Sequence, residues 1–386
     1  MSLIRKNKLV EKLHKYMNDL PPSAAQKTQE WYDIKKKTIG GSEIAILLGV
    51  SSFSDVEKLL NEKRGFVPQF SGNSYTRWGN LFEPITKDYT EQIVSCEIEE
   101  YGSLQGAFDR QRYSPDGIGI VKAKCVDGTY EYFIVLFEFK APSGSLPEGK
   151  IPEQYIPQVQ TGLLSIPICD FAIFVNNCYR KCSLADLSIN NFTTTTSTNG
   201  YDTKYHNGDI KKRKAHLLNA PYAIGIIFFY TKNAVINEFT GQRCDEPSMI
   251  DYGNVDINVM LKQFDDKLIT PYYCKILLTD TNKLSYVKMH SLEQKMSNSK
   301  ACIDEYIERN TREFLSYCTT NKVHTVGFMP YKLLLSDVII EKPDTQWKQK
   351  IETPIKNFLA RLDEKITYDF ACEGSFSGDV VEDLYE

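Results

Sequence analysis

The stretch FIVLFEFKAP, residues 133–142, places Glu138 and Lys140 at the end of an almost wholly apolar run. Such a run predicts a buried strand, and a strand directs alternate side chains to opposite faces. Glu138 and Lys140 therefore share one face, whereas Phe137 and Phe139 point into apolar packing on the other. Two charged groups at the end of a buried strand call for an explanation, and catalysis would provide one.

The residues before this strand supply a second acid. Asp116 belongs to the turn SPDG, and the dipeptide Asp127-Gly128 is a strong hairpin signal that predicts a return strand over residues 130–140. If the two strands pair, Asp116 approaches Glu138.

Two carboxylates beside a lysine suit a hard divalent cation. Mg²⁺ prefers oxygen ligands and retains several waters, so one or two carboxylates suffice. Such an ion lowers the pKa of water and neutralises charge on a phosphate, while Lys140 can orient the attacking water or stabilise developing negative charge. This is the chemistry of phosphodiester hydrolysis. A D…ExK pattern also occurs by chance, and a Glu–Lys pair on a strand is often merely solvated, so the motif alone leaves both interpretations open.

The bulk composition restricts the function class. The chain has 386 residues, 42% of them hydrophobic, which suffices for two domains or one elaborated domain. A net charge of -4 means that any basic surface for nucleic acid must be local. There is no secretory signal and no run of about 18 apolar residues. We therefore expect an intracellular, non-secreted protein with reduced thiols and no membrane contact. None of the five His lies at a zinc-site spacing from Cys178 and Cys182, so we do not expect a structural zinc.

Periodicity and turn signals predict a mixture of helices and strands. Helices are expected at 4–18, 77–94, after Pro157, and at 255–267, 291–316 and 346–362. Strands are expected at 101–109, 117–126, 130–140, 169–177, 222–231 and near 272 and 335. The polar stretch 188–209 predicts a surface loop. This order favours an α/β or α+β fold with a central mixed sheet.

Five segments, in order, resemble a known family: WYDIKKKTIGGSEIAILLG, WGNLFEP, YSPDG, LFEFKAP and YIPQVQTGL. They are similar to the lambda-exonuclease or YqaJ-type branch of the PD-(D/E)xK nucleases, and most of all to the lambda-like exonucleases of asfarviruses and related large DNA viruses. The match covers about residues 31–180. It implies a restriction-endonuclease-like core with N-terminal helices over 1–235. A C-terminal mixed α/β extension would follow over 236–386, with an acidic tail at 377–386.

The resemblance implies roles for individual residues around a metal ion. Asp116, Glu138 and the backbone carbonyl of Phe139 fall on the metal ligands of the family. Glu83 falls on a helix glutamate that helps to organise the metal site, and Lys140 falls on the catalytic lysine.

The same resemblance implies a second set of residues that contact the substrate. Gln158 falls on a helix glutamine near the attacking water, and Tyr155 lies beside it. Tyr155, Lys35 and Ser42 are assigned to DNA and its 5′ phosphate. The family usually has Arg where Lys35 stands, and lysine lacks the bidentate fork of arginine. The phosphate is then held more weakly, unless the two following lysines share the task.

Several of these residues also allow simpler interpretations. Glu83 can be a surface acid of an amphipathic helix, although Pro84 follows it. Ser42 can be the N-cap of the short helix after it, which is compatible with phosphate binding. The lysines at 35–37 can be a solvated face, and Gln158 can simply satisfy buried backbone.

Three further features are expected to have no direct role. Trp31 and Trp78 are expected in the core rather than as base-stacking platforms. The basic run KKRK at 211–214 can touch DNA, direct nuclear import or do neither, and we favour the last.

The resemblance implies a Mg²⁺-dependent exodeoxyribonuclease, with Mn²⁺ as a substitute, that digests double-stranded DNA from its ends, 5′ to 3′. It would serve viral recombination, repair or replication in the host cytoplasm or nucleus. A single-strand annealing protein and further copies of the chain are candidate partners. Two alternatives stay open: an endonuclease with the same core, and a catalytically silent DNA-binding or host-interaction protein.

Overall fold

The computed structural model describes seven stretches of the chain. They are residues 2–21, 28–68, 72–125, 127–187, 223–232, 249–278 and 300–364. Three features expected from the sequence lie outside them: the polar stretch 188–209, the basic run 211–214 and the acidic tail 377–386.

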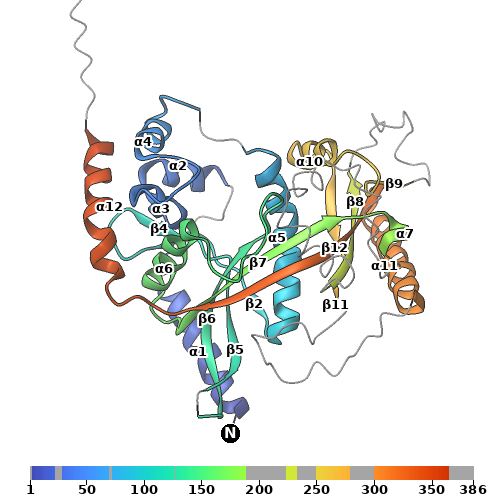
Figure 1. Ribbon diagram of the computed structural model, residues 1–386, viewed down its shortest axis with the longest axis horizontal. Helices are drawn as coiled ribbons and strands as arrows, with labels where there is room; N and C mark the ends of the chain where they lie inside the picture. Colours follow the sequence, from blue (N-terminus) through green and yellow to red (C-terminus); the bar gives the residue numbers. More distant parts are fainter. Residues whose placement is uncertain are drawn as a thin grey trace, which may run out of the picture.

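A long mixed sheet forms the centre of the molecule (Figure 1). Within the described residues its order is β10-β8-β12-β7-β6-β5-β2, with β11 against β8 and β9 against β12. The strands are β2 Ile98–Glu99, β5 Gly117–Lys124, β6 Tyr130–Lys140, β7 Phe171–Lys181, β8 Ala223–Thr231, β9 Ile250–Asp251, β10 Thr270–Tyr273, β11 Leu277–Leu278 and β12 His324–Glu341. β6 and β7 are parallel, whereas β5 and β6 form the expected antiparallel hairpin. The mixed sheet with flanking helices confirms the predicted fold class.

A three-stranded sheet, β1-β4-β3, lies at one end of the molecule among α2, α3, α4, α6 and α12 (Figure 1). Its strands are β1 Ile39–Gly40, β3 Leu104–Gln105 and β4 Gln111–Tyr113. The helical segments are α1 Ser2–Asn18, α2 Gln29–Lys37, η1 Gly41–Glu43, α3 Ile44–Leu47, α4 Val56–Arg64, α5 Ser74–Val94, η2 Glu153–Tyr155, α6 Ile156–Ser165, α7 Leu184–Leu187, α10 Ile257–Asp265, α11 Lys300–Asn321 and α12 Trp347–Asp363. None of the described helices is both long and apolar enough to cross a membrane.

Helices cover both faces of the central sheet, and the strand period decides which side chains they meet. Phe137 and Phe139 of β6 join one buried core, together with Phe82 of α5. Leu136 of the same strand joins the core on the opposite face, together with Leu163 of α6. This alternation confirms that the two phenylalanines point away from the face that Glu138 shares with Leu136.

Helix α5 carries one acid of the predicted site. It begins where the Asn73 side chain accepts hydrogen bonds from the backbone N–H groups of Tyr75 and Thr76, at 3.0 Å each. This N-cap places the start three residues before the position expected from the sequence. Pro84 lies inside the helix, whose buried stripe packs on the sheet and leaves Glu83 exposed.

Residues after position 235 contribute to the centre of the fold. β12 lies between β7 and β8, in the middle of the sheet. Helix α12 then packs against α3, α4 and α6, where the Trp347 Nε1–H donates to Thr161 Oγ1 at 3.1 Å. The C-terminal residues thus share one sheet with residues 1–235, while the domain boundary between them stays a prediction.

The turn GGSE differs from its expected form. Ser42 does not cap the next helix, since the turn forms the 3-10 helix η1 with Gly40 at its N-terminal boundary. The Glu43 side chain accepts a hydrogen bond from the Gly40 backbone N–H at 2.8 Å, which closes the turn on itself. The Ser42 side chain is left exposed.

The segment 101–109, expected to be one strand, is paired over only a short length because side-chain hydrogen bonds replace strand pairing there. Only residues 104–105 are extended and paired. Gln111 Oε1 accepts hydrogen bonds from the backbone N–H groups of Ala107 and Phe108, at 2.7 and 3.3 Å. Side-chain bonds of this kind compete with strand pairing, so the segment turns instead.

Candidate active site

The β5–β6 hairpin brings the two predicted metal-binding acids together. Gly117 pairs with Phe137 at the start of β5, so Asp116 lies just beyond the paired segment. The Asp116 Oδ2 atom accepts a hydrogen bond from the backbone N–H of Phe139 at 2.8 Å. Asp116 is thereby fixed beside the end of β6, where Glu138 and Lys140 lie.

Glu138 is fully buried and is held by two donors. The Lys140 ammonium donates to Glu138 Oε1, as expected for side chains two apart on one strand. The Tyr113 hydroxyl donates to Glu138 Oε2 at 3.1 Å. Lys140 also lies over the Tyr155 ring, with its Nζ atom 5.1 Å from the ring centroid. We call Asp116, Glu138 and Lys140 the hairpin site.

The charges of the hairpin site act strongly on one another. Burial raises the pKa of Asp116 well above its ordinary value, and the negative charge of Glu138 raises it further. Burial acts to lower the pKa of Lys140, but the two carboxylates outweigh this and raise it. Lys140 therefore stays protonated and positively charged, while the negative charges of Asp116 and Glu138 repel each other.

This donor set fits a hard divalent cation. A residue in a β-ladder directs its N–H and C=O groups to the same side, so the Phe139 carbonyl faces the side of Asp116. Two carboxylates and one carbonyl are oxygen ligands of the kind that Mg²⁺ and Mn²⁺ accept. A cation would also relieve the repulsion that raises the pKa of Asp116. The described part of the chain contains no group of three His, Cys, Asp or Glu side chains able to hold a metal, so the carbonyl and waters would have to complete the shell.

Glu83 lies near the hairpin site, but it does not form a three-carboxylate group with Asp116 and Glu138 that could hold a metal. It projects from α5, is exposed, and is among the negative charges that raise the pKa of Asp116. Its charge also acts on Tyr273 of β10, whose pKa is raised by burial and by Glu83. An influence of Glu83 on a bound cation would therefore be indirect.

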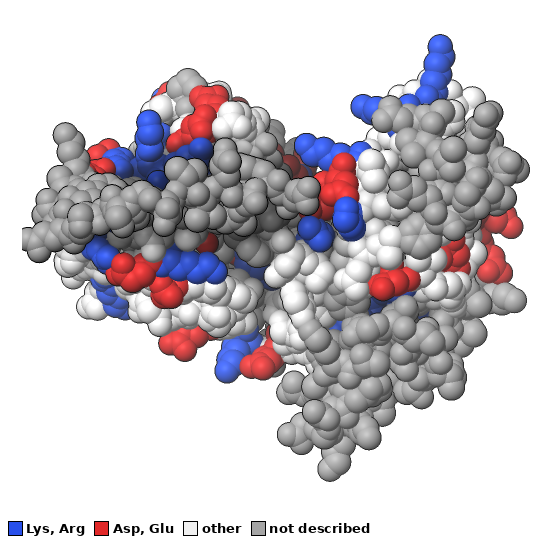
Figure 2. All heavy atoms as spheres, turned by 90° about the horizontal axis from the view of Figure 1, so that it is seen from above, with Lys and Arg blue, Asp and Glu red and all other residues white. Residues whose placement is uncertain are grey.

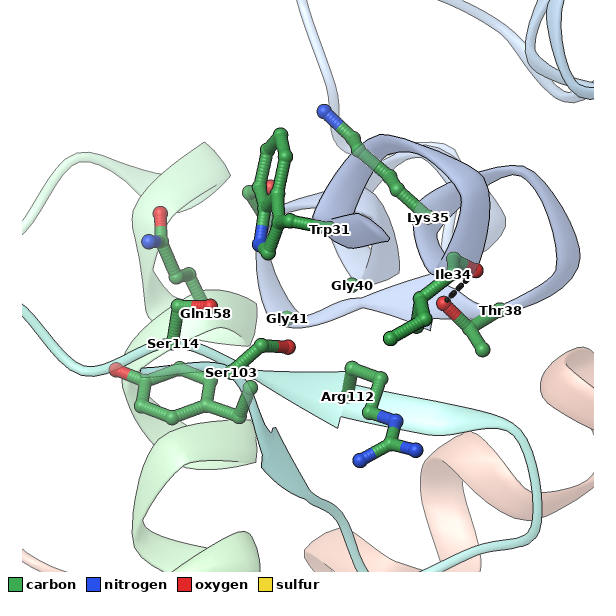
Figure 3. A pocket seen from close by; sticks show the side chains of 12 residues that line it. Trp31, Ile34, Lys35, Thr38, Gly40, Gly41, Ser103, Arg112, Ser114 and Gln158 are labelled. Atoms are coloured by element: carbon green, nitrogen blue, oxygen red, sulfur yellow. Dashed lines mark hydrogen bonds between the residues drawn. The ribbon is translucent and has the colours of Figure 1, made fainter. Parts of the chain in front are cut away.

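A pocket of about 100 Å³, drawn in Figure 3, is lined in part by Tyr113, whose hydroxyl binds Glu138 of the hairpin site. Trp31 and Lys35 project from α2 on one side of it, and Gln158 of α6 lies on the other. Ser42 of η1 and Arg112 of β4 also line it. The Lys35 Nζ atom is 5.0 Å from the centroid of the Trp31 ring. The pocket thus combines cationic and hydroxyl groups, which are suitable donors to a phosphate.

Tyr113 connects the pocket to the hairpin site. Its ring lines the pocket and its hydroxyl binds Glu138. A Cβ atom on Gly41 would lie 2.4 Å from the Tyr113 ring, so only glycine fits there. A Cβ atom on Gly162 of α6 would meet the other end of the ring, also at 2.4 Å. The tyrosine is therefore wedged between η1 and α6.

The predicted substrate-binding residues fall into two places. Lys35, Ser42 and Gln158 line the pocket. Tyr155 lies instead beside Lys140 in the hairpin site. The structure gives their positions, and their roles toward DNA stay predictions.

The two tryptophans behave differently from each other. Trp78 is buried in the main core, as expected. The same expectation for Trp31 is wrong: this residue is partly exposed, lines the pocket and lies under Lys35. Helix α2 contains no buried residue, so no side chain of this helix, Trp31 included, is part of a buried core.

Sequence reasoning also missed several residues. Tyr113 directly precedes the SPDG turn, yet nothing in the local pattern reveals that its hydroxyl reaches Glu138. Arg112, Ser103 and Ser114 line the pocket as well.

Comparison with known proteins finds a family model that is similar to the part of the chain that carries this site. Residues 30–165 match the model of the YqaJ-like viral recombinase domain. A curated protein of African swine fever virus is 28% identical over 192 residues in two versions of the virus, and 26% identical over 191 residues in a third. For the first of these the match covers 45% of this chain and 55% of the relative, so the chain spans about half the length of the curated relatives it matches.

Two crystal structures of an alkaline exonuclease (LHK-Exo) from Laribacter hongkongensis, one of them with dAMP, are 18% identical to the chain. The first match covers 39% of this chain and 74% of the exonuclease chain, with a TM-score of 0.30. A likeness at this level supports no conclusion about the chain. The five segments that suggested the YqaJ-type branch all lie within the region that matches the family model, so the predicted resemblance is confirmed. Residues 30–165 are similar to the YqaJ-like viral recombinase domain.

Proposed function

We propose that this protein is a divalent-cation-dependent deoxyribonuclease that hydrolyses phosphodiester bonds of double-stranded DNA. The observation that carries the proposal is the hairpin site, in which Asp116 is fixed against the backbone of Phe139 beside the buried Glu138–Lys140 pair. A viral recombinase domain has a use for such chemistry, because recombination starts from processed DNA ends.

The residues divide the work of hydrolysis. Asp116, Glu138 and the Phe139 carbonyl would hold Mg²⁺, which would activate water and neutralise phosphate charge when bound. Lys140, kept charged by the two acids, stabilises the negative charge that develops on the phosphate. Tyr113 holds Glu138 from the opposite side and fixes its orientation.

The pocket supports attack from a DNA end. Lys35 and Ser42 would bind a terminal 5′ phosphate, and Gln158 of the same pocket would orient the nucleophile. If the pocket held the 5′ end of a DNA strand, the next phosphodiester bond of that DNA strand would lie toward Lys140. The finer proposal is thus a 5′-to-3′ exonuclease that uses Mg²⁺, with Mn²⁺ as a substitute.

The surface charge bears on how DNA is held. In Figure 2, Lys and Arg are interspersed with Asp and Glu over the described part of the face shown, with no extended basic field. Affinity for DNA then rests on few phosphate contacts and is moderate. A single-strand annealing protein or further copies of this chain would be reasonable partners in recombination, in the host cytoplasm or nucleus.

Digestion of labelled linear duplexes tests the proposal. Release of nucleotides in Mg²⁺ that stops in EDTA, and survival of a covalently closed circle, is the expected result. Cutting of the closed circle would favour an endonuclease. Absence of any cleavage in Mg²⁺ and in Mn²⁺, with DNA binding retained, would favour a silent DNA-binding protein.

A further inference from the structure

A buried ion pair lies directly behind the pocket. Lys63 of α4 and Glu43 of η1 are each 8% exposed, and the Lys63 Nζ atom lies 2.9 Å from Glu43 Oε2. Neither side chain lines the pocket. The sequence alone gave no reason to expect a role for either residue.

The pair ties together the two segments that carry Lys35 and Ser42. The Lys63 ammonium donates to the backbone carbonyl of Lys35 at 2.9 Å and to that of Thr38 at 2.8 Å. Its third donor goes to Glu43. All three hydrogens of the ammonium are therefore used, and two of them bind the end of α2, where carbonyls have no partner within the helix.

Glu43 completes the link on the other side. It accepts a hydrogen bond from the Gly40 backbone N–H at 2.8 Å, which shapes the turn that presents Ser42. A continuous series of hydrogen bonds thus runs from the Lys35 carbonyl through Lys63 and Glu43 to the Gly40 backbone. It braces the end of α2 against η1, a few residues further along the chain, beside the pocket that Lys35 and Ser42 line.

A buried ion pair is a costly way to join two segments. Removing two charges from water costs several kcal/mol in general, and well-packed apolar residues often stabilise as well. Stability alone is a weak reason for such a pair, whereas its directional bonds fix a geometry that apolar packing would leave looser. The pair is therefore better explained by the geometry it gives to α2 and η1 than by its contribution to the free energy of unfolding.

We propose that Lys63 and Glu43 are the positioning residues of the pocket, and that they set the spacing of Lys35 and Ser42 for a terminal phosphate. The inference rests on the proposed function for the identity of the ligand. It assigns no contact with DNA to either residue, since both act through the backbone of α2 and η1.

The test compares linear duplexes that carry a 5′ phosphate or a 5′ hydroxyl. The main variant is the double substitution Lys63→Met with Glu43→Gln, because removing one partner alone would leave a buried unpaired charge. Lys181→Met is the matched control: Lys181 is also buried and likewise uses its ammonium to bind backbone carbonyls, those of Tyr252, Gly253 and Val255. Thermal melting confirms that each variant is folded.

The wild type should have the lower KM for the phosphorylated duplex. In the double variant this KM should rise about tenfold, as expected when one charge-assisted contact is misaligned, while kcat and the KM for the hydroxyl duplex stay unchanged. General structural damage would instead affect both substrates alike. A folded double variant that keeps the wild-type preference overturns the inference. If the double variant does not fold, Lys63→Arg, which keeps the ion pair but changes the shape of its hydrogen bonds, should shift the ratio in the same direction, and an unchanged ratio overturns the inference equally.

Binding in EDTA separates this inference from the proposed function. Anisotropy of the two labelled duplexes needs no turnover. If the wild type prefers the phosphorylated end without ever cleaving it, and the double variant loses that preference, the nuclease proposal fails and the positioning role stands. If the wild type binds both ends equally, the positioning role fails whatever the activity.

Discussion

The hairpin site and the pocket beside it are held by different kinds of structure. The three side chains of the hairpin site come from one antiparallel hairpin, and strand register fixes their relative positions. The pocket is assembled from α2, η1, β4 and α6, and side-chain bonds such as Lys63–Glu43 join its walls. Register is rigid and local, which suits the placement of a cation. Side-chain bonds such as Lys63–Glu43 instead fix the spacing of helical segments that no strand register aligns, which suits recognition of a DNA end.

This contrast predicts that damage to the two regions has different kinetic signatures. A change in the hairpin site should lower kcat for every substrate. A change in the pocket should raise KM for one kind of DNA end.

The largest effect is expected for Asp116→Asn. Losing a carboxylate ligand should reduce kcat by about 10³-fold or more, the scale of a lost electrostatic catalytic element. Because burial and Glu138 raise the pKa of Asp116, its charge opposes folding at pH 7, well above the unfolded pKa. The variant should therefore melt no lower than the wild type in EDTA. Single-turnover digestion and thermal melting measure both effects, and an active variant would exclude Asp116 as a ligand.

Removal of the cation should act on the same region. A ligand that binds only the folded state stabilises it by RT ln(1 + [L]/Kd), so the stabilisation grows with ligand concentration. Mg²⁺ should thus raise the melting temperature of the wild type and leave that of Asp116→Asn unchanged. An equal rise in both proteins would place the ion elsewhere.

A smaller loss is expected for Tyr113→Phe, which tests the link between the two regions. A hydrogen bond to a charged group contributes about 1.5–3 kcal/mol, so kcat should fall about 10- to 100-fold with KM little changed. The ring and its packing against Gly41 remain. Ile46→Val, on α3 near the same end of the fold, serves as a control for mild repacking. A Tyr113→Phe enzyme with full activity would show that Lys140 alone orients Glu138.

The smallest effect is expected in the pocket, for Lys35→Arg and Lys35→Ala. Arginine offers a bidentate fork and should lower KM for a 5′-phosphorylated duplex by a few-fold, whereas alanine should raise it about tenfold. Neither change should alter kcat on a 5′-hydroxyl duplex. Equal effects on both kinds of end would remove Lys35 from phosphate recognition.

The same contrast explains what could be predicted from the sequence. Glu138 and Lys140 could be placed because alternation along one strand decides their direction, and Asp116 because a hairpin signal brought it back to them. The partner of Lys63 lies 20 residues away and its other contacts 25 and 28 residues away, on elements whose packing no local pattern reveals. The central position of β12 escaped prediction for the same reason, since its partners in β7 and β8 lie between 93 and 169 residues earlier in the chain.

Ser42 could be predicted only in part from the sequence. Its exposure at a turn was predictable from the two glycines before it. The form of the turn was not, because it depends on a side-chain bond from Glu43 back to Gly40 and on the Tyr113 ring that only glycine at position 41 can accommodate.

The proposed chemistry depends on one cation that lies between Asp116, Glu138 and the Phe139 carbonyl. Crystals grown with Mn²⁺ and measured at its absorption edge test this directly, because anomalous scattering locates the ion without reference to activity. We predict a single strong peak within about 2.0–2.3 Å of oxygen atoms from those three residues. A well-occupied Mn²⁺ bound elsewhere, with Asp116 and Glu138 left without it, would contradict the proposed site.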